Sequence, residues 1–485
     1  MTRLSSSQSS EDSFFNGEWI RKATVWEECF ELCNNLGCYL IWYQLDLRSK
    51  APLEEAHVRR ALSLLYRKCP ALSLCFGSHS GERWVRRATN PEIDFKVWAL
   101  YSLRIYCVLR NQNIEDVRKF LHSYKYNTET GPLFCARLLL NPTDLRLEED
   151  DQDPKMTHIS YMCFGLAHCF ADGTSNTQIM GFFISLLNDI IASRPISNDP
   201  LGVFVSDDQT AKLVSEKKQL LETNPSLRQK IAKEIEKYKT VQPLLITAFP
   251  APAEERESAS LVKTLNRDIT RRFSQKCKEE SISFNTGLSA IVNVALIDLL
   301  LENGTVKDSY EIQCFHLVNL RRYWEVQLPK ALGLHIGYVL PIYKETPKDA
   351  GGHLFWEYAR SLHQEILHEL DSGKVLLWQA YENPSSKNLP YTAEYLLGDK
   401  SYVGDFLTSN MGDVTSKVTE GGDHVQISNV LRSSAGHLSE FPLELECHTF
   451  RGRLSMIFSY NKAAVSAQLT ENLCNRIVCR IEEFC

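Results

Sequence analysis

The feature that most constrains the fold is a strand, a tight turn and a long helix that follow one another between residues 159 and 191. Residues 159–167 are apolar and aromatic at strand length, and residues 179–191 repeat apolar side chains with the spacing of one broad helical face. Between them lies a hexapeptide, HCFADG, that begins at His168. A turn of this kind can lift one side chain to the rim of a sheet, so His168 is the first candidate for a functional residue.

Strand and helix patterns alternate along the rest of the chain as well, which predicts a mixed α/β fold. Residues 1–12 are polar and are expected to form a disordered tail, and residues 13–205 a first subdomain that contains the hexapeptide. Residues 206–258 are charged, sparse in apolar positions and proline-rich at their end, so we interpret them as a helical segment and linker. Residues 259–485 repeat the make-up of the first half, which suggests a cleft between two similar subdomains.

Charge and cysteine usage exclude several classes of protein. The net charge is −6, without the basic excess that favours nucleic acid or an anionic membrane surface. The apolar run Gly287–Leu301 contains Asn293 and Asp298, so it is expected to be too short and too polar to span a bilayer. The 15 cysteines form no CxxC pair and no zinc-type spacing, and the polar opening residues are not expected to act as a signal peptide. We therefore expect free thiols, no metal site and a cytoplasmic location.

Local chemistry gives His168 two interpretations. An imidazole can remove a proton from a hydroxyl or an amine near neutral pH, and Asp172 could orient its ring or fasten the loop. Gly173 would allow a tight turn that a Cβ would obstruct. The alternative is a half-buried histidine beside a helix cap. A thiol–imidazole pair with Cys169 is not expected, because neighbouring residues on a strand point to opposite faces; Cys169 is expected to pack in the core.

The hexapeptide resembles the H-x-x-x-D-G signature of the chloramphenicol acetyltransferase-like superfamily. This superfamily includes nonribosomal-peptide condensation domains, plant-type acyltransferases, and the alcohol and polyketide-associated acyltransferases. Many members carry a second histidine before the signature, where this chain has Ala167, and that difference argues mildly against a peptide condensation domain. The plant-type D-F-G-W-G motif is absent. Further similar segments occur in the family's order, at Arg67–Leu72, Gly131–Phe134, Val318–Arg321, Leu332–Gly337 and Thr408–Gly412.

The resemblance implies two chloramphenicol acetyltransferase-like subdomains, each a mixed sheet flanked by helices, with a channel between them. It implies that His168 is the general base, that Asp172 pairs structurally with an arginine, and that Arg321 in a bidentate contact is the best candidate for that partner. Gly173 is counted with these structural residues. Residues that would donate to the developing oxyanion or contact substrate are Asn319, Ser409, Asn410 and Gly412. Two further histidines, His158 and His335, receive no role.

The expected reaction is transfer of an acyl group from a CoA thioester to a hydroxyl or amine, without an acyl-enzyme. Acyl-CoA is then a co-substrate, no tightly bound cofactor is needed, and a monomer suffices because both halves of the site lie in one chain. One alternative is a stand-alone condensation-type enzyme that uses a donor bound to a carrier protein. A second is a non-catalytic binding member of the fold. A third, an unrelated α/β protein with an accidental motif, predicts no cleft at His168.

Overall fold

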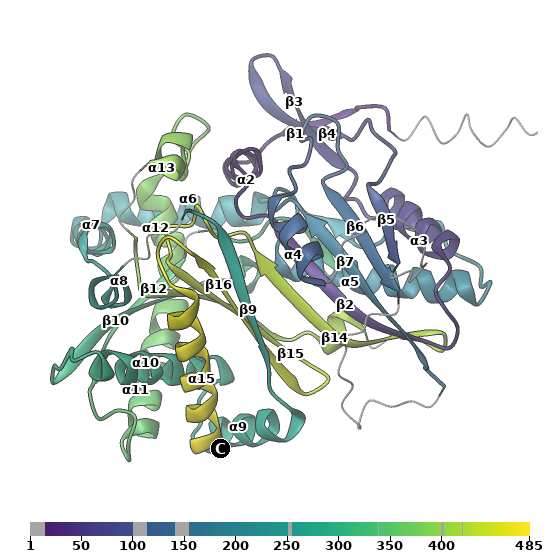
Figure 1. Cartoon of the computed structure of the whole chain (residues 1–485). Coiled ribbons are helices and arrows are strands. Elements are labelled where there is room, and N and C mark those ends of the chain that lie inside the picture. The colour runs from purple at the N-terminus through teal and green to yellow at the C-terminus, as the bar shows by residue number, and fades with distance from the viewer. Residues whose placement is uncertain are drawn as a thin grey trace, which may run out of the picture.

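The structure is a computed structural model in which two lobes, each a β-sheet with helices, lie side by side (Figure 1). The predicted tail, residues 1–12, lies outside the described residues. The described residues are 15–99, 114–140, 155–250, 255–337, 339–398, 402–419 and 421–485.

The first lobe is built on a five-stranded sheet with the strand order β14-β2-β7-β6-β5. Side chains alternate across it, so that Tyr43 and Leu45 enter the core on one face while Trp42 enters the core on the other. The face of β2 that carries Tyr43 and Leu45 is apolar, whereas Trp42 shares the other face with the buried polar side chains of Gln44, Asp46 and Arg48. The strands are β2 (Ile41–Ser49), β5 (Phe95–Ala99), β6 (Phe134–Leu140), β7 (His158–Leu166) and β14 (Val425–Ser434).

Helices cover both faces of this sheet. The core that contains Tyr43 is closed by α3 (Glu55–Lys68) and α5 (Gly173–Ile191). The opposite core is closed by α2 (Val25–Leu36) and α4 (Ile114–Ser123). A capping box starts α2, because Thr24 and Glu27 bond to each other's backbone N–H groups. A small sheet of β1 (Trp19–Lys22), β4 (Glu82–Arg87) and β3 (Leu74–His79) lies beside these helices.

Strand β14 belongs to the second half of the sequence and to the first sheet in space. It pairs antiparallel with β2 over its whole length, from Val425 opposite Ser49 to Ser434 opposite Ile41. The division at residue 259 into two self-contained halves is therefore wrong for this strand. The physical reason is that β2 would otherwise present an open hydrogen-bonding edge, which β14 covers.

The second lobe has a six-stranded mixed sheet with the order β12-β10-β13-β15-β16-β9. Strand β13 runs parallel to both of its neighbours, and the other pairs are antiparallel. One large core joins this sheet to α9 (Arg267–Glu279), α10 (Phe284–Glu302), α11 (Phe355–Asp371) and α15 (Ala467–Glu483). The strands are β9 (Ser258–Thr264), β10 (Ser309–His316), β12 (Leu340–Pro347), β13 (Phe406–Asp413), β15 (Leu443–Phe450) and β16 (Arg453–Asn461).

Helix α10 is long and apolar enough to cross a membrane by length and composition alone, and among the described helices no other is. The run Gly287–Leu301 was expected to be too short, but the helix extends beyond it at both ends, from Phe284 to Glu302. Within the structure 78% of its most apolar window is buried. A buried core helix of a folded lobe passes the same test of length and hydropathy, so α10 is weak evidence for a membrane segment.

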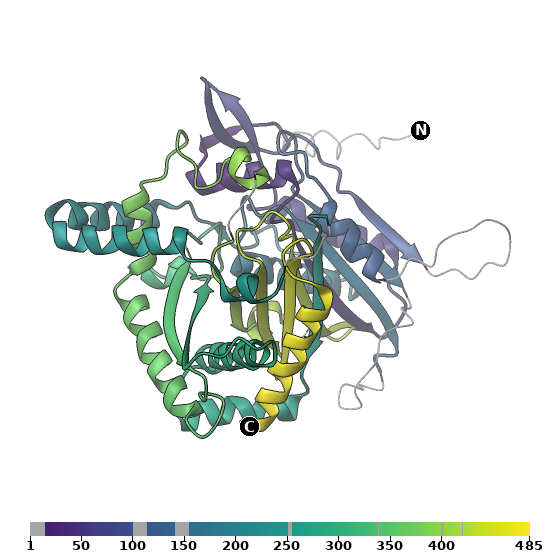
Figure 2. The same ribbon diagram turned by 60° about the vertical axis from the view of Figure 1, so that its left-hand side comes forward.

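Residues 206–258 contain two long helices, α6 (Asp208–Thr223) and α7 (Pro225–Thr240), that stand out from the body of the molecule (Figure 2). Their few apolar side chains, among them Leu221 and Ile231, pack against Trp378. That residue belongs to α12 (Lys374–Glu382), on which both helices rest. The remaining short elements are α8 (Leu244–Ala248), η2 (Leu320–Tyr323), β8 (Val203–Phe204), β11 (Ala331–Leu332), α13 (Ala393–Leu397) and α14 (Thr415–Val418).

Candidate active site

The hexapeptide connects the end of β7 to the start of α5. The last backbone contact of the strand is made by the Ala167 N–H, which donates to the carbonyl of Leu133 at 2.9 Å. Helix α5 begins at Gly173, and the side chain of Asp172 caps it by accepting from the Ser175 N–H at 2.9 Å. His168 therefore lies in a turn that is fixed at both ends. This turn follows the C-terminal end of β7, the central strand of the first sheet.

His168 lines a cavity of about 140 Å³, which we call the smaller cavity. Its ring packs against Phe30 with a centroid distance of 4.5 Å. Its Nδ1 atom is buried and has no hydrogen-bond partner among the described residues. Burial lowers the pKa of the imidazole, and the negative charge of Asp172 opposes this shift without cancelling it. The ring is therefore neutral at pH 7, the form that can accept a proton.

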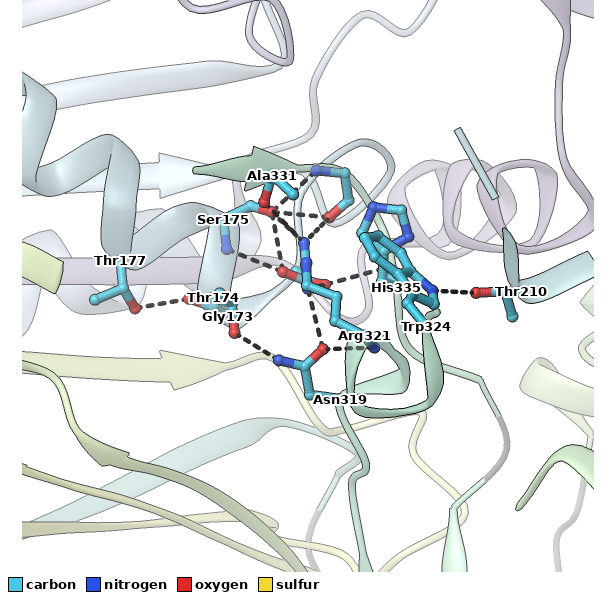
Figure 3. Close-up of polar contacts among 12 residues, drawn as sticks. Gly173, Thr174, Ser175, Thr177, Thr210, Asn319, Arg321, Trp324, Ala331 and His335 are labelled. Atoms are coloured by element: carbon cyan, nitrogen blue, oxygen red, sulfur yellow. Dashed lines mark hydrogen bonds and ion pairs between the residues drawn. The ribbon is translucent and has the colours of Figure 1, made fainter. Parts of the chain in front are cut away.

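Asp172 is tied to both lobes by four hydrogen bonds, whose donors belong to Ser175, Arg321 and His335, the residues labelled in Figure 3. Its Oδ1 accepts from the N–H and the hydroxyl of Ser175, and its Oδ2 accepts from Arg321 Nη1 at 2.6 Å and from the His335 N–H at 3.0 Å. Burial alone would raise the pKa of Asp172, but the charge and hydrogen bond of Arg321 outweigh it and hold the pKa below its ordinary value. This carboxylate fastens the turn, and its oxygens are occupied by other donors than His168.

Arg321 contacts Asp172 through one nitrogen, so the expectation of a bidentate contact is wrong. Its second terminal nitrogen, Nη2, is used elsewhere: it donates to Ser175 Oγ at 3.1 Å and to the carbonyls of Ala331 and Gly333 at 3.3 and 3.4 Å. With the Asn319 side chain included, the guanidinium is thus shared among five acceptors at a junction between β11, η2 and α5.

Asn319 completes this network from the second lobe. Its Oδ1 accepts from the Arg321 N–H at 3.1 Å and from Arg321 Nη1 at 3.2 Å, while its Nδ2 donates to Thr174 Oγ1 at 3.2 Å. Thr174 is in the first turn of α5. Asn319 therefore joins the loop after β10 to the helix that follows the hexapeptide, and most of its amide is engaged within the protein.

The reason for glycine at position 173 differs from the one predicted. Gly173 is the first residue of α5, and its backbone does not adopt the positive φ angles that other glycines of this chain show. A Cβ at this position would lie 2.7 Å from the sulfur of Met411 on β13. The glycine is needed for the close approach of the second lobe to the helix start, and the turn itself does not require it.

A second, larger cavity of about 1190 Å³ lies on the other side of the β10 and β13 strand ends. Both cavities are lined by Leu317, Val318, Asn319 and Asn410, so they meet at these residues. The smaller cavity lies between the lobes, where the channel was expected, and the larger one adjoins it within the second lobe. Of the other predicted substrate-contacting residues, Ser409 lines the smaller cavity and Gly412 lines the larger one.

The hydroxyl of Ser409 accepts a hydrogen bond from Arg432 Nη2 at 3.0 Å, which leaves its own proton free to donate into the smaller cavity. Asn410 is more constrained, because its Oδ1 accepts from the Gly412 N–H at 2.8 Å and its Nδ2 donates to Asn285 at 3.0 Å. Gly412 has a positive φ of 65°, which suits glycine, and it contributes only backbone. Of these three residues, Ser409 is the one that offers a hydroxyl donor at the wall of the smaller cavity.

No family model matches the sequence, and no curated protein does. Solved structures match over nearly the whole chain. TRI3 trichothecene 15-O-acetyltransferase from Fusarium sporotrichioides is 12% identical, over 98% of both chains, with a TM-score of 0.67. The epimerization domain from the third module of tyrocidine synthetase B is 13% identical, over 97% of this chain and 98% of that chain, with a TM-score of 0.63. The first condensation domain of the calcium-dependent antibiotic synthetase is 13% identical, over 97% of both chains, with a TM-score of 0.64. The chain has the chloramphenicol acetyltransferase-like fold.

The predicted class of fold, with two subdomains that each combine a β-sheet with flanking helices, is thereby confirmed. At 12–13% identity the similarity concerns the fold, and what each of these proteins does is a property of that protein. The roles assigned to His168 and its neighbours remain predictions that depend on the site itself. The described residues contain no group of three or more His, Cys, Asp or Glu side chains placed to hold a metal ion.

The other residues considered from the sequence lie away from the ring of His168 in this chloramphenicol acetyltransferase-like fold. Cys169 is fully buried in the core of the first lobe, where burial raises the pKa of its thiol, so it forms no thiol–imidazole pair. His335 packs edge-on against Trp324 at 4.5 Å, outside both cavities, and serves Asp172 only through its backbone N–H. His158 begins β7 at the far end of the strand and has no place in the site.

Sequence reasoning missed three charged residues of the smaller cavity: Arg432 on β14, and Glu444 and Glu446 on β15. The alternation Leu-Glu-Leu-Glu at 443–446 is typical of a strand with one solvent-exposed face. In this chloramphenicol acetyltransferase-like fold that face lines the channel instead. The pattern of two acids alternating with leucines was visible in the sequence, but only the position of β14 shows what these acids face.

Proposed function

We propose that the chain transfers an acyl group from a CoA thioester to a hydroxyl or amine of a small-molecule or lipid acceptor, with His168 as general base. The observation that carries the proposal is the position of a neutral imidazole in the smaller cavity, next to the place where the larger cavity meets it. One solved protein of the same fold is an O-acetyltransferase by its name, which supports the same class of reaction here.

The steps follow from the residues of the turn and of β13. His168 takes the proton of the acceptor as its oxygen or nitrogen attacks the thioester carbonyl. The hydroxyl of Ser409 donates to the oxyanion that develops. When the C–S bond breaks, His168 returns the proton to the departing thiolate, so that the products are the acylated acceptor and free CoA. Asp172 and Arg321 hold the turn in place and do not exchange protons with substrate.

The larger cavity is the proposed entrance for the donor. Three arginines line it, Arg267, Arg271 and Arg322, and guanidinium groups suit the phosphates of CoA. Its lining is otherwise a mixture of polar and apolar side chains, which suits the amide-containing arm that links those phosphates to the thioester. The acceptor then enters the smaller cavity. Acyl-CoA as co-substrate, a monomeric state and a cytoplasmic location all remain predictions from the sequence.

The main alternative is a donor presented by a carrier protein. The condensation and epimerization domains that share the fold favour it, since both are by their names single domains of larger synthetases. A non-catalytic binding protein with the same cavities is the other alternative. All three proposals require the channel, but they differ in whether free acyl-CoA is consumed and whether His168 is needed.

The test is to incubate the protein with acyl-CoAs of increasing chain length, with and without alcohols and amines, and to measure free CoA by mass spectrometry. We expect acceptor-dependent release of CoA, and a loss of about 10²- to 10⁴-fold in His168→Ala. His158→Ala is the matched control, because this histidine lies at the opposite end of β7, and it should retain activity. Acyl-CoA binding without release would favour the alternatives, and an active His168→Ala variant would refute the role of His168.

A further inference from the structure

The wall of the smaller cavity contains three charged side chains that the proposed mechanism does not use. Arg432, Glu444 and Glu446 are 7%, 5% and 3% exposed, and all three line the same cavity as His168. Glu444 and Glu446 are two positions apart on β15 and therefore point to the same face of that strand. The cavity thus holds two carboxyl groups and one guanidinium away from bulk water.

These groups are incompletely paired within the described part of the chain. Glu444 Oε2 accepts from the Ser434 hydroxyl at 3.0 Å, but Glu444 Oε1 and Glu446 Oε2 are buried without a hydrogen-bond partner. Arg432 does not neutralise them by a direct contact: its Nη2 donates to the carbonyl and hydroxyl of Ser409, and its Nε has no partner. Buried carboxyl oxygens without donors are costly, and native proteins rarely leave them so.

Burial raises the pKa of both carboxyl groups, and that of Glu446 reaches about 7 although Arg432 opposes the shift. Each group would gain most from a donor that also carries positive charge, because such a donor would stabilise the ionised carboxylate inside the cavity. The aromatic lining agrees with a cation, since ring faces attract positive charge in desolvated sites. The rings that line this cavity are Trp26, Phe30, Tyr39, Tyr43, Tyr391 and Phe441.

We infer that the acceptor is an amino alcohol or a diamine, with a protonated amine bound by Glu444 and Glu446 and a second group presented to His168. This inference rests on the proposed function and names its acceptor class. The bound ammonium has no lone pair and is not acylated. The nucleophile is the other hydroxyl or amine of the same molecule, which loses its proton to His168 as it bonds to the thioester carbonyl carbon. When the C–S bond breaks, His168 returns that proton to the departing thiolate.

Binding is tested first, in a variant that cannot turn over. Calorimetric titration of His168→Ala with 4-aminobutan-1-ol and with pentan-1-ol compares a cation with a neutral molecule of the same shape. We expect the amino alcohol to bind at least about tenfold more tightly, as the loss of a charged hydrogen bond would produce. Glu446→Gln and Glu444→Gln in the same background should each reduce that preference, and together abolish it. Equal affinity for the two molecules overturns the inference, and this comparison does not depend on how well the glutamine variants fold.

Turnover separates this inference from the proposed function. In the active protein, Glu446→Gln should raise KM for 4-aminobutan-1-ol by about tenfold or more with little change in kcat, and should leave KM for pentan-1-ol unchanged. A purely structural role for Glu446 would change both acceptors alike and would refute the inference. Tight binding of the amine without release of CoA from any donor would support the binding site and refute acyl transfer. Efficient transfer to neutral alcohols, without transfer to 4-aminobutan-1-ol, would support acyl transfer and refute the binding site for the amine.

Discussion

Arg321 Nη1 donates to Asp172 Oδ2 across 2.6 Å, although the two residues are 149 positions apart in the chain. This contact joins the helix that follows the hexapeptide to the loop that follows β10. Asp172 is 2% exposed and Arg321 is 9% exposed, so neither charge is well solvated. The position of the His168 turn is therefore set by the second lobe as much as by the first.

Replacement of Arg321 should be costly to stability and to activity. Arg321→Ala leaves the carboxylate of Asp172 buried without its counter-charge, and we expect a loss of about 3–5 kcal/mol in the free energy of unfolding. Urea denaturation measures this loss, and CoA release should fall with it. Asp172→Asn combined with Arg321→Met removes both charges and should recover part of the stability. A single Arg321→Ala variant as stable as the parent would show that the pair does not hold the lobes together.

The pH dependence of kcat/KM should report a histidine with a depressed pKa. His168 acts as a base only when neutral, and burial lowers its pKa below the ordinary value of about 6.5. With a neutral alcohol as acceptor, kcat/KM should stay constant from pH 8 to about 6.5 and fall at lower pH. Asp172→Asn removes a charge that raises the pKa of His168, so the acid limb should move to lower pH. An acid limb centred above pH 7 would contradict the burial of His168.

Ser409→Ala should lower kcat more than it changes KM. The hydroxyl is expected to bond the oxyanion and not the ground-state carbonyl, and loss of one such donor costs about 10²- to 10³-fold in kcat. Steady-state kinetics with a saturating donor measures both constants. Ser428→Ala is the matched control, because this buried serine of β14 bonds only the carbonyl of Asp46 at 3.1 Å. Equal effects on the two variants would remove Ser409 from the mechanism.

Gly173→Ala should affect substrate binding more than folding. The new Cβ would lie 2.7 Å from the sulfur of Met411. Because that side chain is flexible, we expect the free energy of unfolding to fall by about 1 kcal/mol, near the lower end of the range for overpacked cores. Met411 also lines the smaller cavity, so its displacement should raise KM for the acceptor. Met411→Ala in the Gly173→Ala background should restore KM, whereas Met411→Ala alone should not lower it below the parent value. No change in KM for Gly173→Ala would show that Met411 moves away from the cavity.

Local patterns predicted the elements around the hexapeptide closely. The expected strand at residues 159–167 is β7, His158–Leu166, and the long apolar helix is α5. Both have strong periodicity and clear boundaries, namely the turn and the Asp172 cap. The contact of Arg321 with Asp172 was expected from family resemblance and not from spacing, because no local pattern relates positions so far apart.

The pairing of β14 with β2 and the burial of Glu444 and Glu446 could not be predicted in the same way. Strand β14 was expected as a strand, but the sheet that it joins depends on which edge is open in the folded lobes. The two glutamates look like a solvent-exposed strand face, and they become channel lining only because β14 and the first lobe cover them. Both features arise from contacts between the halves, which periodicity does not encode.

The pairing of β14 with the first sheet also determines when that sheet can be completed during synthesis of the chain. Residues 41–49 leave the ribosome well before their partners at residues 425–434 are made. Until then one edge of β2 is unpaired, and the nascent first lobe presents an open strand to any other chain nearby. Contacts between positions this distant in the sequence also form slowly, since a long loop must close before they stabilise anything. Folding of the lobe that contains His168 is therefore completed only after β14 has been synthesised.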